Sequence, residues 1–304
     1  METRRLATFV RIVDVGSLTR AADVLHIAQP ALSQQINALE AELGQRLLIR
    51  SKQGVEPTEA GAALYRHAQV ILKQLDDAVA EVALLGREVA GQVFVGLAPY
   101  STANLIALPL LRAVRTHFPH VMLRVTDNFA LVLSEAMMTG QLHLAILYDS
   151  GPIKGLSFER LITEQLLLVC APGIGPEADE VPIEALADVP MMLPRPVHTI
   201  HATVNRALEA VGAHATVVAE LESVGLMAQA VAAGLGATML PRSVAERLAA
   251  DSGLRLIRVS TPIEVHLSLG TPSSLPLSRA AECVRDLLRR VVANTLVNPT
   301  VDIR

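Results

Sequence analysis

The sequence predicts an all-α winged helix-turn-helix unit at the N-terminus, then a long linker helix, and then an α/β region that forms two lobes. Two short amphipathic segments fill residues 17–43, an apolar seven-residue repeat runs through 64–89, and strand and helix patterns alternate from residue 91. We expect boundaries at 1–58, 59–90 and 91–304, with one lobe formed by about 91–160 and 265–304 and the other by about 161–264.

The composition is that of a folded protein whose core consists of small aliphatic side chains. Hydrophobic residues make up 51% of the chain, aromatic residues only 3%, and tryptophan is absent. No run approaches the roughly 18 apolar residues of a membrane span, and the first residues, METRRLATF, lack the apolar stretch of a signal peptide. We therefore expect a cytoplasmic protein without a membrane partner. Cys170 and Cys283 predict no disulfide scaffold, and we expect both to be buried.

The distribution of charge does not by itself predict binding to nucleic acid. The net charge is −4, which argues against a protein that coats nucleic acid non-specifically. Residues 1–66 contain eight Lys and Arg and seven Asp and Glu, whereas the remaining residues contain 18 and 23. A prediction of DNA binding must therefore depend on the arrangement of particular side chains.

Three short helices are predicted in the first 43 residues. A supporting helix covers 4–15, because four apolar residues recur at helical spacing before the stop signal Gly16. These residues are Leu6, Phe9, Val10 and Val13. Ser17 is a candidate N-cap of the second helix, and Pro30 stands where the first turn of a third helix tolerates proline.

The third helix has two contrasting faces. Its apolar stripe consists of Leu32, Ile36, Leu39 and Leu43. The opposite face carries Gln29, Ser33, Gln34 and Asn37. Amide and hydroxyl groups both donate to and accept from base edges, and a helix in this position of a helix-turn-helix enters the major groove. An ordinary surface helix is the alternative interpretation.

Residues 46–58 indicate a strand, a turn at Gly54 and a return strand. Arg50 and Lys52 lie on this hairpin, where a cationic side chain reaches phosphate or the adjacent minor groove. The pattern is typical of the wing of a DNA-binding domain, and a solvated hairpin is the alternative.

A helix of about 30 residues is predicted from the candidate N-cap Thr58 to residue 89. Its apolar residues form two interleaved seven-residue series, Leu64, Ile71, Ala78, Leu85 and Ala68, Leu75, Val82, Val89. A lone helix would leave this seam in water, so we expect it to pair with a second copy of the chain. The alternative is packing against the protein's own globular domain.

From residue 91 the pattern indicates an α/β fold with a parallel sheet. Strands are expected at 92–98, 121–127 and 142–147, with helices at 103–117 and 130–139 between them. Later strands are expected near 161–170, 190–193, 216–221, 236–240, 254–258 and 263–270, and later helices near 199–211, 223–233, 242–249 and 277–293. Ligands of open α/β sheets bind beyond the carboxyl ends of the strands. The predicted wall of a ligand cleft is therefore Pro99, Tyr100, Ser101, Thr102, Asn128, Phe129, Tyr148 and Pro196–His201, which includes His198 and Thr199.

The order of these segments resembles the LysR-type transcriptional regulators, and within them the nitrogen assimilation control subgroup. The resemblance is carried by GSLTRAADVLHIAQPALSQQINALEAELGQRLLIR at 16–50, GVEPTEAG at 54–61 and AVAAGLGATMLP at 230–241. It implies a homodimer or a dimer of dimers that binds an interrupted dyad in double-stranded promoter DNA. It also implies an effector domain like a type 2 periplasmic binding protein, which senses a small molecule, and RNA polymerase as a further candidate partner.

The resemblance also implies roles for residues near the N-terminus. Gln29, Pro30, Ser33 and Gln34 match the positions that touch bases and backbone, Thr19 and Arg20 lie near phosphate, and Arg50 matches the wing arginine. The chain departs from the family at two positions, where Ala28 replaces a capping Ser or Thr and Gln53 replaces Arg. Lys52 is a candidate substitute for the lost charge.

In the effector domain, Ser101 and Thr102 match hydroxyl residues at the mouth of the cleft. They precede a helix, whose N-terminus favours an anion. His201 stands where many relatives have Arg, and a neutral imidazole holds a carboxylate less firmly than a guanidinium does. An effector-independent regulator therefore remains an alternative.

Enzymes and transport proteins are the competing classes. His117-x-x-His120 and His198-x-x-His201 have spacings that suit a metal, but neither pair has companion carboxylates or thiols nearby. The sequence has no G-x-S-x-G motif, and GLAPYST lacks the glycines of a dinucleotide loop. We therefore expect no enzymatic activity, metal or cofactor. A solute-binding protein of transport would need an export signal and would not need residues 1–90.

Overall fold

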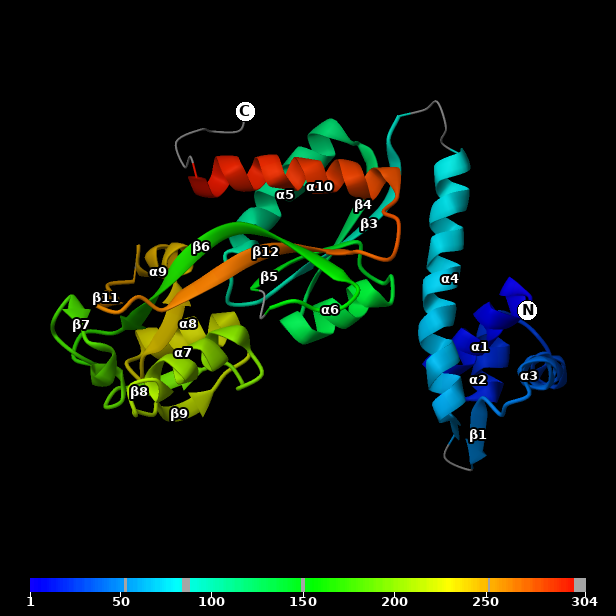
Figure 1. Cartoon of the computed structure of the whole chain (residues 1–304), viewed down its shortest axis with the longest axis horizontal. Helices are drawn as coiled ribbons and strands as arrows, with labels where there is room; N and C mark the ends of the chain where they lie inside the picture. The colour runs from blue at the N-terminus through cyan, green and yellow to red at the C-terminus, as the bar shows by residue number, and fades with distance from the viewer. Residues whose placement is uncertain (52–53, 84–87, 149–150, 251, 298–304) are drawn as a thin grey trace. The chain divides into compact units, whose positions relative to one another are not determined.

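The structure, a computed structural model, describes residues 1–51, 54–83, 88–148, 151–250 and 252–297 (Figure 1). The chain forms two compact units. One is Met1–Arg87 together with Thr139–Gln141, and the other is Glu88–Met138 with Leu142–Arg304.

The first unit contains the predicted helix-turn-helix and hairpin. Its elements are α1 (Thr3–Val15), α2 (Leu18–Leu25), α3 (Gln29–Leu43), β1 (Leu48–Ser51), β2 (Gly54–Pro57) and α4 (Glu59–Ala83). Gly16 ends α1 in the left-handed conformation with φ 66°, and the Ser17 hydroxyl caps α2 by accepting from the Arg20 N–H. Ala28 supplies no side-chain cap to α3. Phe9, Ile12 and Leu32 are fully buried between the three helices.

The hairpin β1–β2 is fixed to the helices through backbone atoms. The Val55 N–H donates to the Gly16 carbonyl over 2.9 Å, which joins the hairpin to the end of α1. The Thr58 N–H donates to the Leu47 carbonyl over 2.9 Å, which closes the base of the hairpin. The Thr58 hydroxyl accepts from the Gly61 N–H at 3.0 Å and so caps α4. A Cβ on Gly61 would lie 2.0 Å from the Leu47 oxygen, so only glycine permits α4 to start this close to the hairpin.

The linker helix is shorter than the sequence predicts. Helix α4 ends at Ala83, whereas Glu88 and Val89 are not helical and Ala90 begins the first strand of the second unit. Val89 does not continue the helical repeat, because it packs against the hydrophobic core of the second unit.

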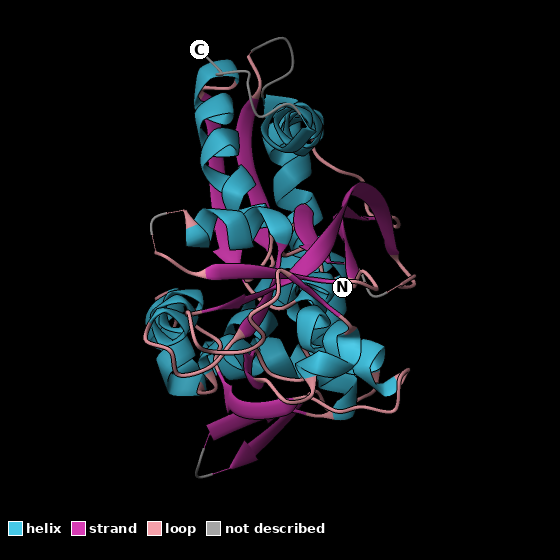
Figure 2. Cartoon of the chain, turned by 90° about the vertical axis from the view of Figure 1, so that its left-hand side faces the viewer, coloured by secondary structure: helices cyan, strands magenta, loops and turns pink. Residues whose placement is uncertain are grey.

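The second unit is an α/β structure in which helices flank the strands (Figure 2). Its helices are α5 (Ala103–His117), α6 (Ala130–Met138), α7 (Thr199–Glu209), α8 (Val224–Ala232), α9 (Arg242–Ala249) and α10 (Arg279–Val292), with a 3₁₀ turn η1 (Ile183–Leu186) and a π-helical turn η2 (Ala293–Val297). Its strands are β3 (Ala90–Leu97), β4 (His120–Asp127), β5 (Leu144–Tyr148), β6 (Leu156–Cys170), β7 (Glu180–Val181), β8 (Pro190–Leu193), β9 (Thr216–Glu220), β10 (Thr238–Pro241), β11 (Arg255–Val259) and β12 (Glu264–Pro272).

The main sheet is mixed, so the expectation of a parallel sheet was wrong in part. Strands β3, β4 and β5 are parallel, but β12 is antiparallel to both β5 and β6 in the order β4-β3-β5-β12-β6-β11-β7. The first part of β6 pairs with β12, and its last residues pair with β10 and β11. β6 therefore runs from one lobe into the other, and the pairing partner changes at Gln165 and Leu166.

Two further features of the second unit differ from the sequence prediction. β6 begins at Leu156, before the expected residue 161, because residues 156–164 pair with β12. Cys170 is buried as expected, but Cys283 on α10 is only partly buried.

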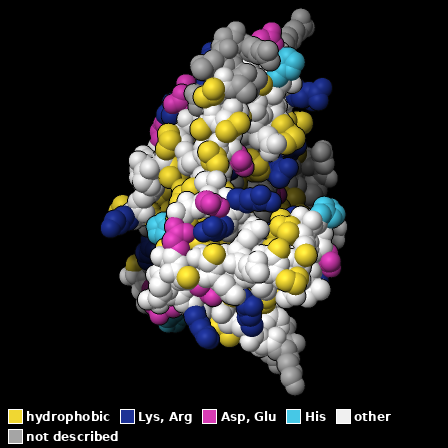
Figure 3. All heavy atoms as spheres, turned by 90° about the vertical axis from the view of Figure 1, so that its right-hand side faces the viewer, with side chains coloured by type: hydrophobic (Ala, Val, Ile, Leu, Met, Phe, Trp, Pro, Cys, Tyr) yellow, Lys and Arg dark blue, Asp and Glu magenta, His cyan; other side chains and the backbone are white. Residues whose placement is uncertain are grey.

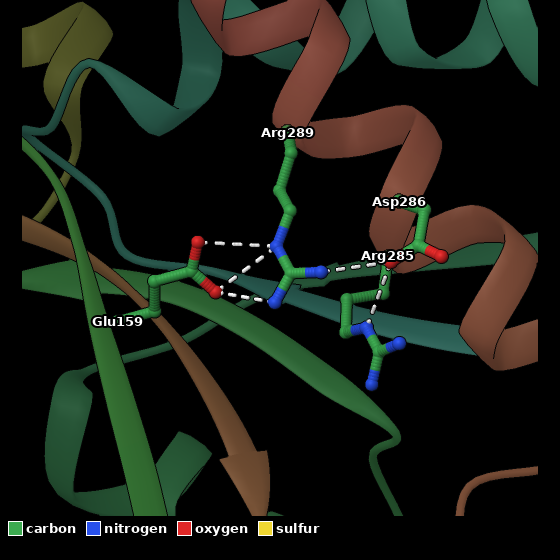
Figure 4. Close-up of polar contacts among 4 residues, drawn as sticks. All are labelled: Glu159, Arg285, Asp286 and Arg289. Carbon is green, nitrogen blue, oxygen red and sulfur yellow. Dashed lines mark hydrogen bonds and ion pairs between the residues drawn. The ribbon is translucent and has the colours of Figure 1, made fainter.

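An ion-pair network joins α10 to β6. The Arg289 guanidinium contacts both carboxylate oxygens of Glu159, with Nε at 3.1 and 3.0 Å, and also binds Asp286 at 2.8 Å. Arg285 contacts the same Asp286 carboxylate (Figure 4).

Candidate DNA-binding surface and interlobe cleft

The polar face of α3 lies on the surface of the first unit. Gln29, Pro30, Gln34 and Asn37 are exposed, and Ser33 is partly buried. On the opposite face Leu32, Ile36 and Leu39 are fully buried, but Leu43, which the pattern placed on the same stripe, is 40% exposed because it is the last residue of the helix. The exposed face therefore presents amide and hydroxyl groups, and none of the residues predicted to contact DNA on this face is acidic.

The structure brings Asn37 and Arg50 together. The Arg50 guanidinium donates to the Asn37 side-chain oxygen over 3.2 Å, and both residues are exposed. Together with Arg46 they line a hollow of about 360 Å³ between α3 and the hairpin. Thr19 and Arg20 are exposed at the start of α2, with the Arg20 guanidinium 3.0 Å from the Val15 carbonyl. Lys52 lies outside the described residues.

Glu40 is a positioning residue that the sequence analysis missed. Its Oε1 atom, on α3, accepts from the N–H groups of Leu47 and Leu48 at 2.7 and 3.2 Å. This contact sets the hairpin, and with it Arg50, against α3. The sequence does not distinguish this glutamate from an ordinary surface glutamate on the same helix, so its role was not predictable.

Helix α4 has an apolar face that the unit itself leaves uncovered. Leu64 packs against the core of the unit and Ala68 is fully buried, so these two of the predicted pairing residues serve the unit's own fold. Ile71, Leu75 and Val82 are 40%, 45% and 68% exposed, and Ala78 is exposed as well. Val79, which the heptad assignment left out, extends this face and is 63% exposed. Leu85 lies outside the described residues. Figure 3 shows one face of the molecule, on which hydrophobic side chains lie at the surface among Lys and Arg.

In the second unit, most of the predicted effector residues are buried. Tyr100, Ser101, Thr102 and Tyr148 are at most 2% exposed. The Ser101 hydroxyl donates to the Ala98 carbonyl over 2.6 Å, and the Tyr100 hydroxyl donates to the Leu221 carbonyl over 2.7 Å. Burial raises the pKa of Tyr100 to about 12. These groups bind the protein itself and do not form an open wall.

The two histidines after β8 are also buried. His198 caps α7, because its Nδ1 accepts from the Ile200 N–H at 3.3 Å, and its Nε2 lies 3.1 Å from the Pro99 carbonyl. Burial lowers the pKa of His198 to about 4. The contact with the Pro99 carbonyl raises this pKa in part, and the neighbouring His201 lowers it further. Nδ1 of His201 lies 2.6 Å from the Pro194 carbonyl, so its imidazole is committed to the backbone.

Family models match both units. Residues 3–62 match the bacterial regulatory helix-turn-helix of the LysR family, and residues 86–293 match the LysR substrate binding domain. The chain belongs to the LysR family of transcriptional regulators. It is therefore a DNA-binding transcription regulator with an effector-binding domain, and it is not an enzyme.

Known proteins resemble this LysR-type regulator over nearly its whole length. It is 41% identical over 301 residues to the nitrogen assimilation regulatory protein Nac of Escherichia coli, covering 98% of this chain and 97% of Nac. Its fold resembles a full-length variant of OxyR from Pseudomonas aeruginosa, with a TM-score of 0.71, 22% identity and coverage of 96% and 95%. It also resembles full-length CbnR complexed with its target DNA, with a TM-score of 0.66, 24% identity and coverage of 96% and 100%.

A cleft in the effector-binding domain of this LysR-type regulator contains two of the predicted residues that follow β4. The cleft is about 430 Å³ and is lined by Pro99, Asn104, Asp127, Asn128, Phe129, Glu222 and Val224. The Arg195 guanidinium lies 5.3 Å from the centre of the Phe129 ring and forms an ion pair with Glu222. The predicted Thr199 lies instead in a hollow of about 260 Å³ that also includes Arg206 and His266. The sequence pattern gave no signal for Arg195 or Glu222.

Neither histidine pair of this regulator has the surroundings of a metal site. Among the described residues, no group of three His, Cys, Asp or Glu side chains is placed to hold a metal ion. His120 contacts Glu88 at 3.1 Å. Within the same part of the chain, no helix is both long and apolar enough to cross a membrane.

Proposed function

We propose that the protein acts in the cytoplasm as a homodimer, or a pair of dimers, that binds an interrupted dyad in promoter DNA and regulates transcription. The observation that carries this proposal is that one compact unit contains both an exposed polar face on α3 and an exposed apolar face on α4. The first suits the edges of base pairs, and the second suits a twofold partner. Two copies of the unit would then grip two half-sites.

Self-association is supported by the spacing of the exposed residues on α4. Ile71, Leu75, Ala78, Val79 and Val82 lie within one stripe of the helix at steps of three and four residues. Monomeric proteins rarely leave such a continuous apolar stripe in water, and a second α4 would cover it. For pairing of dimers, the exposed Leu108 and Leu111 of α5 and Met122 of the edge strand β4 offer a further apolar surface.

For DNA, we propose that Gln29, Ser33 and Gln34 contact base edges, while Pro30 and Asn37 lie beside them and Asn37 orients Arg50. Thr19, Arg20 and Arg50 contact phosphate or the minor groove, together with Lys52. An arginine that contacts one phosphate contributes to the salt dependence of binding, so Arg50→Ala should reduce the slope of log K against log salt by about 0.9.

The DNA-binding proposal is tested by footprinting the full-length protein on the DNA upstream of its own gene. Joint replacement of Gln29, Ser33, Gln34 and Arg50 by Ala should remove the footprint while the far-ultraviolet circular dichroism stays unchanged. An unaltered footprint would contradict these assignments.

The dimer proposal needs a separate variant. Leu75→Asp places a charge in the exposed apolar face and should give a monomer by sedimentation, whereas Ala80→Asp, on the other side of the same helix, should leave the assembly intact. Dimers of equal stability for both variants would contradict the assignment of this face.

For a small-molecule effector, we propose the cleft lined by Asn104, Asp127, Asn128 and Glu222. The Arg195 guanidinium offsets the charge of Glu222, which leaves Asp127 as the other carboxylate that lines the cleft. The cleft therefore favours a neutral or amino compound over the anion that the position of Ser101 and Thr102 led us to expect. A thermal-shift screen of amino compounds against organic acids, with Asp127→Asn as the control, distinguishes them. If neither class shifts the melting temperature, the effector-independent regulator is supported.

The similarity to Nac supports a proposal about physiology. That relative is named a nitrogen assimilation regulatory protein and is 41% identical to this chain. We propose that the target genes belong to the same class, and that RNA polymerase is contacted at their promoters. Loss of the gene should then alter transcript levels under nitrogen limitation, and unchanged levels would count against this.

A further inference from the structure

A buried carboxyl group lies where the two lobes meet, and neither the predicted site nor the proposed function uses it. Glu164 is 9% exposed. It is located on β6 next to Gln165 and Leu166, where β6 leaves its pairing with β12 and enters the other lobe. A buried acid at a crossing point between lobes needs partners from its surroundings.

Those partners are hydroxyl groups. Oε2 of Glu164 accepts from the Thr102 hydroxyl and, over 3.1 Å, from the Tyr148 hydroxyl. Oε1 accepts from the Ser243 hydroxyl over 2.6 Å, with the Ser243 N–H at 3.4 Å. The hydroxyls of Thr102 and Ser243 are themselves 2.7 Å apart. Both oxygens of the carboxyl group are therefore bound, and by side chains far apart in the sequence.

The partners come from both lobes. Thr102 precedes α5 and Tyr148 ends β5, and both elements belong to the lobe built on β3, β4 and β5. Ser243 lies in the first turn of α9, which packs on the far part of β6 in the other lobe. One carboxyl group on the connecting strand thus holds groups of both lobes at once.

The hydroxyl groups of Thr102, Tyr148 and Ser243 form a cradle around the carboxyl group. Such a cradle is the type of site that would bind the carboxylate of a small molecule. Hydroxyl groups beside the N-termini of helices are favourable donors to an anion. In this chain the nearby donors are already used: the Ala103 N–H donates to the Ser101 hydroxyl over 3.1 Å, and the Thr102 N–H points to the Tyr148 hydroxyl at 3.4 Å. The Glu164 carboxyl group already occupies the position that the carboxylate of a small molecule would take.

We propose that Glu164 is a built-in ligand, which occupies a carboxylate-binding cradle between the lobes and holds the effector-binding domain in one arrangement without an external acid. An external carboxylate can enter the cradle only when the Glu164 side chain is removed. This inference concerns the second unit alone and does not depend on which DNA the protein binds.

The test is chemical rescue of Glu164→Ala in the full-length protein. The variant should melt below the native protein in sodium chloride, and acetate or formate at equal ionic strength should raise its melting temperature by about 3 °C when present at about ten times the dissociation constant. The native protein should show no such rise. Glu159→Ala is the matched control, because Glu159 lies on the same strand but is exposed and paired with Arg289.

A second variant separates loss of charge from loss of volume. Glu164→Gln keeps an accepting oxygen and fills the cradle, so it should melt below the native protein but not respond to acetate. If Glu164→Ala folds only in acetate or formate buffer, that result supports the proposal. The proposal is overturned if acetate raises the melting temperature of the native protein equally. It is also overturned if Glu164→Ala has the same melting temperature in chloride, acetate and formate, or fails to fold in all three.

Discussion

The buried His198 predicts a specific dependence of stability on pH. Its imidazole joins the two lobes, since Nε2 contacts the Pro99 carbonyl from the opposite lobe while Nδ1 caps α7. The rings of Tyr100 and Phe129 pack edge-on against it, with centroids at 5.6 and 5.9 Å. Protonation would remove the Nδ1 acceptor and place a charge among these aromatic rings, so burial favours the neutral form. Replacing His198 by Asn keeps a good capping residue but removes the titration.

The size of the effect follows from the pKa of His198, which burial lowers from 6.5 to about 4. Between these values the unfolded chain binds more protons than the folded chain, so stability increases with pH across this window. The contribution is fully present above pH 6.5 and is lost as the pH falls towards 4. Each unit of difference in pKa corresponds to about 1.4 kcal/mol, so the full loss is about 3 kcal/mol, and about 2 kcal/mol is lost by pH 5.

Urea denaturation followed by far-ultraviolet circular dichroism at pH 7.5 and pH 5.0 measures this loss. The free energy of unfolding of the native protein should fall by about 2 kcal/mol more than that of His198→Asn. His117→Asn, at an exposed histidine, should behave like the native protein. Equal losses for the native protein and His198→Asn would refute the assignment of a neutral, buried imidazole.

Three further substitutions test the packing on which the sites depend. Glu40→Ala should destabilise the protein by about 2 kcal/mol and weaken DNA binding in a gel-shift assay, because two N–H groups of the hairpin lose their acceptor, whereas Glu40→Gln should keep most of both. Gly61→Ala should lower the free energy of unfolding by about 3 kcal/mol in a urea titration, because the new Cβ would lie 2.0 Å from the Leu47 oxygen. An unfolding midpoint equal to that of the native protein would contradict so close a contact between α4 and the hairpin. Thr238→Val should gain about 1 kcal/mol, because the buried Thr238 hydroxyl has no partner among the described residues, and a loss of stability would reveal one.

Local patterns in the sequence predicted the first unit well. Helical spacing, the stop at Gly16 and the cap at Ser17 define α1 and α2 from neighbouring residues alone, and the structure confirms each of them. The end of α4 was not predictable in this way. Val89 continues the seven-residue repeat in the sequence, but packing in the second unit removes it from the helix.

Contacts between distant residues were beyond the sequence patterns. The hydroxyl residues Ser101 and Thr102 were identified, and an anion was expected beside them, but nothing near them in the sequence indicates that Glu164 supplies that anion. β6 pairs with β12 along its first part and with β10 and β11 along its last part. This change of partners brings Glu164, Tyr148 and Ser243 together, and the sequence patterns do not reveal it.

The central claim is that the exposed face of α4 pairs two copies so that both α3 helices read one DNA site. Native mass spectrometry of the protein with a footprinted promoter fragment tests it most directly. The expected result is two or four chains on each duplex, with Leu75→Asp giving only weakly bound single chains. A single native chain that binds the duplex with full affinity would contradict the claim.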